Sequence, residues 1–265
     1  LGEGKMADVY LARHVLIDRL SAIKVLRPGF GGDLNVRRRF LQEAKAVNRI
    51  NHPNIVEITD YGETDGTAYL VIGSMPGEAL ARHLAQGPVG FTRALQIGLQ
   101  ISSALSRSHE MGVVHRDLTP ANVLLVPRRD GGDLVKLTDF GVARMLHSTV
   151  TGPTYTGSND AGLAPNYTAP EVVALGTVDP RSDLYSLGVL LYETTSGRLP
   201  RQPLSGVPAD ARAPSSIKPP ARLADVAPGV PPLFDEIVST LLAVDPDDRP
   251  RDAFETFEML RRVAE

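Results

Sequence analysis

The chain has 265 residues, of which 42% are hydrophobic and 22% charged, and its formal net charge is −3. This balance is ordinary for a globular protein and gives no electrostatic reason to expect nucleic acid or a membrane surface as the main partner. The absence of cysteine excludes disulfides, thiolate catalysis and Cys-based metal sites, and no run of about 18 apolar residues is present that would span a membrane.

The first third of the chain is predicted to be rich in strands. Short apolar and β-branched runs predict strands over residues 8–12, 21–26, 55–61 and 67–72. Between Leu34 and Ile50, apolar residues recur at helical spacing, and the Pro53 region ends that helix.

From about residue 78 the pattern becomes mainly helical. One helix ends near Gly112, and others are predicted over 182–196, 233–244 and 253–263, with a hairpin formed by 123–126 and 134–137. Residues 145–162 are predicted to be mobile and the Pro-rich residues 197–232 to form an extended loop. We therefore expect an α+β fold with a small β-rich lobe over 1–73 and a larger, mainly α-helical lobe over 74–265.

A turn with two glycines, reading Gly2-Glu3-Gly4-Lys5-Met6-Ala7-Asp8-Val9, lies at the start of the chain. Glycines let the backbone approach phosphate oxygens closely and offer N–H donors to them. A plain hairpin explains such a pair of glycines about equally well, so the turn alone decides nothing.

A lysine and a glutamate in the first lobe suggest an ion pair. Lys24 lies in a predicted strand, where a lone lysine usually faces solvent, and Glu43 lies on the predicted helix that follows. An ion pair between them would hold the ammonium group against the α- and β-phosphates of a nucleotide.

The most informative segment reads His115-Arg116-Asp117-Leu118-Thr119-Pro120-Ala121-Asn122. An Asp followed five positions later by an Asn, behind His-Arg, resembles a protein-kinase catalytic loop. The resemblance implies that the Asp accepts the proton of an attacking hydroxyl and that the Asn holds a metal ion that bridges phosphates. Asp139 follows the predicted hairpin in Asp139-Phe140-Gly141, and its carboxylate would chelate Mg²⁺ beside Asn122, because a hard cation prefers oxygen ligands.

Three further positions are expected to support this site. Glu171, in Ala169-Pro170-Glu171, would pair with Arg249 as a structural tie. Asp183 and Gly188 would anchor the backbone of the 115–122 segment from a buried helix, and His115 is expected to pack beside Phe140.

These motifs, in this order, resemble the eukaryotic-like protein kinase family, and most closely its bacterial Ser/Thr branch. The resemblance runs over essentially the whole chain, so it implies one catalytic domain over 1–265 with the bilobal protein-kinase-like fold. It implies a serine/threonine kinase that transfers the γ-phosphoryl group of Mg²⁺-ATP to protein hydroxyls and autophosphorylates in its activation segment. Mn²⁺ is an alternative ion.

The resemblance also implies a role for each matching residue. Asp117 is expected to be the base, Lys24 and Asn122 further catalytic residues, and Asn122 and Asp139 the metal ligands. The residues expected to bind ATP are Leu1, Gly2, Gly4, Val9, Ala22, Lys24, Glu43, Ile72, Gly73, Met75 and Leu124. Among them Ile72 is the gatekeeper, 73–75 is the hinge, and Val9, Ala22 and Leu124 enclose the adenine ring.

The sequence departs from the family pattern at several positions. Thr119 stands where the family usually has Lys, Ala164 stands where it usually has Thr, and Ala7 replaces the third glycine. The Pro-rich residues 198–232 replace a helix that helps to dock protein substrates. Either the chain is an impaired pseudokinase that acts as a nucleotide-binding scaffold, or Thr119 and Ala164 form a rewired pair. Losing one donor to the transition state costs about 10²–10³ in rate, and Lys24, Asp117 and Asp139 are all present, so the sequence favours an active enzyme.

The resemblance implies regulation by phosphorylation of the activation segment. A phosphate on Thr149, Thr151, Thr154 or Thr156 would bind Arg116 and Arg144, with help from 37–39, although these three arginines are also typical of a solvated helix face. Protein substrates are the expected partners, and a homodimer for autophosphorylation in trans is a candidate assembly. No nucleic-acid or membrane contact is expected of the domain itself, which is expected to be cytoplasmic, with any membrane anchor elsewhere in the protein.

A small-molecule kinase with the same lobes is the competing enzyme class. Ala169-Pro170-Glu171 together with Arg249 argues against it, because such enzymes lack this peptide-docking segment. The spacing of Pro165, Tyr167 and Ala169 is similar to the Ser/Thr form of that segment and disfavours tyrosine specificity.

Overall fold

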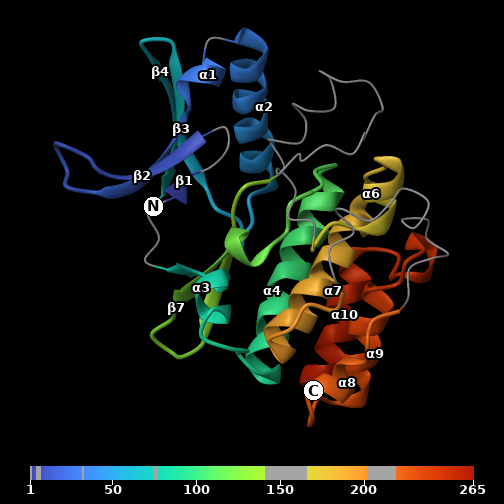
Figure 1. Ribbon diagram of the computed structural model, residues 1–265. Coiled ribbons are helices and arrows are strands. Elements are labelled where there is room, and N and C mark those ends of the chain that lie inside the picture. Colours follow the sequence, from blue (N-terminus) through green and yellow to red (C-terminus); the bar gives the residue numbers. More distant parts are fainter. Residues whose placement is uncertain (1, 4–6, 32, 74–76, 141–165, 202–218) are drawn as a thin grey trace.

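The computed structural model describes residues 2–3, 7–31, 33–73, 77–140, 166–201 and 219–265. Figure 1 shows a twisted sheet with the long helix α2 beside it at one end of the molecule, and a group of helices at the other end. The α+β, two-lobed architecture expected from the sequence is confirmed.

The first lobe is built on a five-stranded antiparallel sheet with the order β1-β2-β3-β5-β4. Its strands are β1 (Gly2–Glu3), β2 (Ala7–Arg13), β3 (Leu20–Leu26), β4 (Ile58–Thr64) and β5 (Thr67–Gly73). The register places Val9 opposite Lys24. It places Ala22 opposite Ile72, and Ala22 is two residues from Lys24 on β3. Because side chains alternate along a strand and directly paired residues share a face, these four side chains lie on one face of the sheet.

Helix α2 (Leu34–Ile50) packs on this sheet, after the short helix α1 (Pro28–Gly31). Its N-terminus is capped by Asp33, whose carboxylate accepts a hydrogen bond from Asn35 N at 2.7 Å. Phe40 and Ala44 lie on the buried face of α2 and form a small core with sheet residues that include Leu26 and Leu70.

Strand β4 begins three residues later than the sequence pattern suggests. Residues 55–57 were included in the predicted strand, but Ile55 pairs with Leu137 in an isolated bridge, and Val56 N donates to Leu137 O at 3.0 Å. Leu137 N in turn donates to Asn54 O at 2.8 Å. The apolar run is therefore real, but its first part is bonded to the second lobe and only its later part joins the sheet.

The second lobe combines helices with a three-stranded sheet of order β6-β7-β8. Its elements are β6 (Glu78–Ala79), α3 (Leu80–Leu84), α4 (Phe91–Glu110), the 3₁₀ turn η1 (Pro120–Asn122), β7 (Val123–Pro127), β8 (Asp133–Leu137), α6 (Pro170–Leu175), α7 (Pro180–Ser196), α8 (Leu223–Val226), α9 (Pro232–Leu241), η4 (Pro246–Asp248) and α10 (Ala253–Ala264). The predicted hairpin and the predicted long helices are present. Three short helices, α3, α6 and α8, were not predicted.

Helix α7 runs through the middle of the second lobe, between α4 and α9 (Figure 1). Almost all residues of α7 are buried. Gly98 on α4 and Gly188 on α7 itself allow the neighbouring helices to approach α7 closely. A Cβ on Gly98 of α4 would lie 2.9 Å from Leu191 Cδ2, and one on Gly188 would lie 2.8 Å from Leu241 Cβ of α9. Gly188 thus allows the close contact between α7 and α9, and its expected role in anchoring the 115–122 segment stays a prediction.

Part of the Pro-rich stretch is helical rather than extended. Helix α8 forms a single turn within residues 219–232. It is held against α9 by a hydrogen bond of 3.2 Å from Ala224 N to the side chain of Asp235. Residues 202–218 of this stretch and the segment 145–162 predicted to be mobile lie outside the described residues. Within the described ranges, no helix has the length and apolar character needed to cross a bilayer.

Gly77 follows the predicted hinge and lies against β7 without room for a side chain. A Cβ there would come within 2.6 Å of Leu125 O and 2.9 Å of Val126 Cγ2. Gly77→Ala is therefore expected to lower the free energy of unfolding by about 1–3 kcal/mol, the usual cost of overpacking. Urea unfolding measures this change. Gly73→Ala is the matched control, because nothing lies within 4 Å of a Cβ at Gly73, and an equal loss in both variants would contradict the steric explanation.

Candidate active site

The backbone of the 115–122 segment is held by one buried carboxylate on α7. Asp183 accepts hydrogen bonds from His115 N and Arg116 N, each at 2.8 Å. These bonds stabilise Arg116 in the left-handed conformation, with φ of 68°, which is unfavourable for a residue with a side chain. The anchoring role that the sequence predicted for Asp183 is thus seen in the geometry.

His109 is a third partner of Asp183 that was not predicted from the sequence. Its Nε2 lies 2.8 Å from Asp183 Oδ2, and both side chains are almost completely buried. Burial alone would raise the pKa of Asp183, but the hydrogen bond with His109 and the bond from the His115 backbone N outweigh burial and lower it below its ordinary value. The carboxylate therefore stays ionised beneath the loop.

Asp117 and Asn122 are brought together by the η1 turn. Asn122 Nδ2 donates to Asp117 O at 2.8 Å and to Asp117 Oδ2 at 3.1 Å. Because the side-chain nitrogen Nδ2 is used in this way, the side-chain oxygen Oδ1 of Asn122 is the atom that remains to bind a metal ion. The Asp117 carboxylate is fixed by the same contact.

Lys24 and Asp139 join the two lobes at this site. Their side chains form an ion pair, with Lys24 mostly buried at 15% exposure and Asp139 at 42%. Asp139 is held beside the loop because its neighbour, Thr138, donates through its backbone N to Asn122 O at 3.0 Å. The side chain of Glu43, the expected partner of Lys24, lies outside the described part of the molecule, so that pair stays a prediction.

His115 packs against Phe140, as expected. The ring centroids are 4.4 Å apart and His115 is fully buried. Burial is the main cause of its lowered pKa, so the ring is neutral near pH 7. His115 therefore fills the core beneath the loop and has no solvent-exposed proton to transfer.

The oxygen ligands that Asn122 and Asp139 offer fit a metal ion that keeps most of its coordinated water. Among the described residues, no group of three or more histidine, aspartate or glutamate side chains is placed to hold a metal. Asn122 and Asp139 offer two oxygen ligands, and Mg²⁺ commonly binds through one or two protein oxygens, with waters and phosphate oxygens completing the octahedron. The residues present are thus compatible with Mg²⁺.

The expected nucleotide residues are partly described. Val9, Ala22 and Ile72 are half-buried apolar side chains on the same sheet face as Lys24. Leu124 is half-buried on β7, Gly73 ends β5, and the Gly2 backbone pairs with Val9. Leu1, Gly4 and Met75 lie outside the described residues, as do Ala164, Arg144 and the four candidate phosphorylation sites, Thr149, Thr151, Thr154 and Thr156.

The docking segment after residue 165 is fixed to α6 and α7. Arg249 donates to both oxygens of Glu171, at 2.8 and 2.7 Å, which confirms the predicted structural pair. Tyr167 donates its hydroxyl hydrogen to Glu193, and burial followed by this bond raises the pKa of Tyr167. The Tyr167–Glu193 contact was not predicted from the sequence, because Glu193 belongs to none of the recognised motifs.

Arg37 does not behave as part of a free basic patch. It forms an ion pair with Glu63 of β4 and is therefore part of the first lobe's own packing. Arg38 is exposed, which fits a solvated helix face, and the side chain of Arg39 lies outside the described set.

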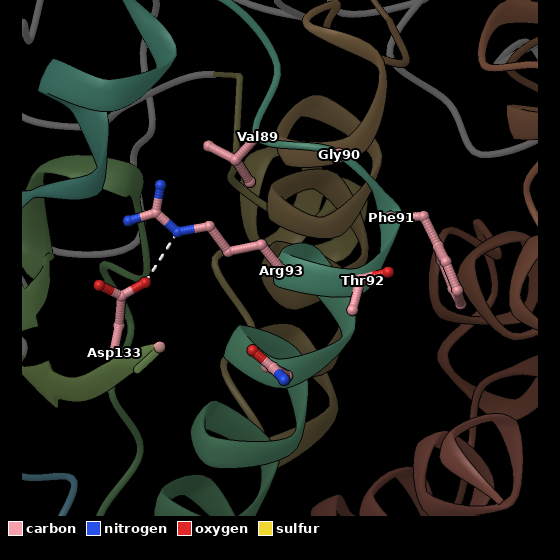
Figure 2. A pocket seen from close by; sticks show the side chains of 8 residues that line it. Val89, Gly90, Phe91, Thr92, Arg93 and Asp133 are labelled. Carbon is pink, nitrogen blue, oxygen red and sulfur yellow. Dashed lines mark hydrogen bonds and ion pairs between the residues drawn. The ribbon is translucent and has the colours of Figure 1, made fainter. Parts of the chain in front are cut away.

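A surface hollow of about 550 Å³ lies at the other end of α4 from the loop (Figure 2). It is lined by Val89, Gly90, Phe91, Thr92, Arg93, Gln96, Gly132 and Asp133. Arg93 and Asp133 form an ion pair at its edge, with Nε 2.7 Å from Oδ2. Because α4 has 20 residues, it is about 30 Å long, and the hollow is distinct from the Asp117 site.

Comparison with known proteins agrees with this site. Residues 1–259 match the family model described as protein kinase domain. The chain is 36% identical to the serine/threonine-protein kinase pkn3 of Myxococcus xanthus, covering 96% of this chain and 47% of that protein. It is 37% identical to PknJ of Mycobacterium tuberculosis, covering 93% and 41%, and 37% identical to PrkC of Bacillus subtilis, covering 94% and 37%.

Solved structures give the same picture. The crystal structure of the PknI kinase domain of Mycobacterium tuberculosis superposes with a TM-score of 0.72 at 30% identity, covering 99% of this chain and 93% of that one. The chain spans less than half the length of the curated relatives named above.

Proposed function

The chain belongs to the protein kinase family, in its bacterial serine/threonine branch, and we propose that it transfers the γ-phosphoryl group of Mg²⁺-bound ATP to serine and threonine hydroxyls of proteins. The observation that carries this proposal is the ion pair between Lys24 and Asp139, which joins the two lobes beside the Asp117–Asn122 contact. Family membership supports ATP, a divalent metal ion and protein substrates in general. Mg²⁺, the individual residue roles and autophosphorylation are our proposals.

Asp117 is proposed as the base that orients and deprotonates the acceptor. The acceptor oxygen attacks the γ-phosphorus, the bond to the oxygen that bridges the β- and γ-phosphates breaks, and ADP leaves with that electron pair. The hydroxyl proton passes to the Asp117 carboxylate. The contact with Asn122 supports this role because it holds the carboxylate in one orientation.

Asn122 and Asp139 are proposed as the Mg²⁺ ligands, with Mn²⁺ as an alternative ion. The metal would neutralise charge on the transferred phosphoryl group. Lys24 is proposed to hold the α- and β-phosphates once nucleotide is bound, in a pair with Glu43. Val9, Ala22, Ile72 and Leu124 would contact adenine, and the segments that hold Leu1, Gly2, Gly4, Gly73 and Met75 would complete the nucleotide site.

An active enzyme is favoured over a nucleotide-binding scaffold. Lys24, Asp117 and Asp139 are all retained, and in the fold they lie at one site. Thr119 is buried at 6% exposure at the start of the η1 turn, so its replacement of lysine removes one cationic donor and leaves the loop geometry intact.

Autophosphorylation of Thr149, Thr151, Thr154 or Thr156, in trans within a homodimer, is proposed to regulate the enzyme through Arg116 and Arg144. We propose one cytoplasmic catalytic domain over 1–265 with lobes 1–73 and 74–265.

Phosphoryl transfer is tested by incubating the protein with Mg²⁺ and radiolabelled ATP. Wild type is expected to label itself and an added protein acceptor, and Asp117→Asn is expected to be slower by about 10²–10⁴, the usual contribution of a positioned base. Lys24→Met should also be impaired. Wild type that labels no faster than Asp117→Asn, while still being stabilised by ATP in a thermal shift, would point to the scaffold instead.

A further inference from the structure

A half-buried ion pair links β2 to the residue that follows β3, at the end of the glycine motif 2–9. Arg27 Nε donates to both oxygens of Asp8, at 2.9 and 3.1 Å, and Arg27 Nη2 donates to Asp8 Oδ1 at 2.7 Å. The exposed fractions of the two side chains are 36% for Arg27 and 23% for Asp8. A forked Arg–carboxylate pair with this geometry is among the few surface ion pairs that contribute measurably to the stability of the fold.

The pair connects β2 to the end of β3, and β2 also pairs with β1 along its backbone. Asp8 on β2 lies opposite Glu3 of β1 and also opposite Val25 of β3. Arg27 is the first residue after β3 and three residues beyond Lys24. Strand β1 has only two residues and lies at the edge of the sheet, so its own ladder contributes little to holding the turn in place.

The pair lies on the other face of the sheet from the proposed nucleotide residues. Neighbouring residues on a strand point to opposite faces, so Asp8 faces away from Val9, and Val25 faces away from Lys24. Arg27 reaches Asp8 and therefore lies on that same outer face. The two charged groups thus act on the position of the backbone and have no contact with phosphate.

We propose that Asp8 and Arg27 are positioning residues for the nucleotide phosphates. By holding β2 against β3, the pair keeps β2 in register with Lys24, which lies opposite Val9. Strand β2 begins at Ala7, within the glycine motif 2–9, and residues 4–6 of that motif lie outside the described part of the chain. This inference rests on the proposed function. Misplacing a binding group by about 1 Å can cost about 10²-fold, so a partial loosening of the β2–β3 pairing is expected to weaken nucleotide binding several-fold.

The same hairpin contains a matched control. At its other end Arg13 and Asp18 form a pair of the same chemistry, with Nη1 3.7 Å from Oδ1 and exposed fractions of 63% and 84%. An ion pair with such exposed side chains and such a long N–O distance contributes almost nothing to stability. Asp18→Asn therefore makes the same chemical change in the connection of the same hairpin, where it is not expected to loosen the β2–β3 pairing.

The test compares Asp8→Asn, Arg27→Gln, the reversed pair Asp8→Arg with Arg27→Asp, and Asp18→Asn. Each is titrated with a fluorescent ATP analogue, and KM for ATP, kcat and the melting temperature are measured on the same preparations. Both single variants are expected to raise the dissociation constant and KM about three- to ten-fold, with kcat within about two-fold. The reversed pair should restore most of the affinity, and Asp18→Asn should match wild type.

Two results would overturn the positioning role. One is unchanged analogue affinity in both single variants, even with a lowered melting temperature, which would show a purely structural pair. The other is a reversed pair as weak as the single variants. Analogue binding does not depend on turnover, so a wild type that binds the analogue but transfers no phosphate would refute the proposed function alone.

Discussion

Replacing Asp183 by alanine is expected to reduce phosphoryl transfer by about 10²-fold or more and to destabilise the protein as well. Asp183 holds His115 N and Arg116 N, so its loss lets the backbone of the catalytic loop relax from the left-handed conformation of Arg116. A shift of about 1 Å in a catalytic group can cost about 10²-fold. The buried donors left without an acceptor should each cost about 1–3 kcal/mol. Steady-state kinetics and urea unfolding measure the two effects.

Asp179→Ala is the control for the loss of stability. Asp179 caps the same helix and accepts a hydrogen bond from Arg181 N at 2.6 Å, so its removal should cost about 1 kcal/mol without moving the catalytic loop. If the two variants lose equal activity, the Asp183 effect is one of general stability and the anchoring role is wrong.

The charge of Asp183 also predicts a dependence on pH. Its pKa in the folded protein is lowered from the ordinary value of 3.8, so its stabilising contribution is complete above that value and is lost as the pH falls through the lowered pKa. The difference in unfolding free energy between wild type and Asp183→Asn should therefore be constant from neutral pH down to about 4 and shrink below it. A constant difference at lower pH would contradict the assignment.

Breaking the Glu171–Arg249 pair is expected to lower the free energy of unfolding by about 3–5 kcal/mol, because the remaining charge is buried without its partner. The exposed fraction of the Arg249 side chain is 0% and that of Glu171 is 10%. Arg249 also donates to the carbonyl oxygens of Ala243 and Arg181, at 2.9 and 3.0 Å. Arg249→Ala therefore removes several bonds at once.

Two further variants make this test specific. Arg251→Ala is the matched control, since Arg251 is 79% exposed and paired only at the surface with Asp252, and it should change stability by less than about 0.5 kcal/mol. Arg249→Lys keeps the charge but cannot form the fork, so it should stay clearly destabilised. Denaturant unfolding of the three proteins is sufficient, and a loss below 1 kcal/mol for Arg249→Ala would refute the buried-pair explanation.

The sequence predicted those features that are encoded by local motifs. Asp183 and its backbone partners, the packing of His115 on Phe140, and the Glu171–Arg249 pair all follow from residue types in recognised segments. The long helices were found because an amphipathic period repeats over several turns.

The features that the sequence did not predict lie outside those motifs. Helices α3, α6 and α8 are too short to show a period, and the start of β4 is displaced because Ile55 pairs with Leu137. His109 belongs to none of those motifs, so its pairing with Asp183 was not predicted. The candidate phosphorylation sites stay predictions, because they lie outside the described residues.

The bonds between residues 54–56 and β8 have a mechanical consequence for α2. The C-terminal end of this helix is attached to the helical lobe through Val56 and Asn54, whereas Arg37 attaches its N-terminal part to β4 of the sheet. Opening or closing of the lobes would therefore turn α2 about a pivot near Ile50. The backbone of Glu43 lies seven residues, or about 10 Å, from that pivot. A rotation of about 10° would thus swing it by about 2 Å, enough to engage or release a side-chain contact.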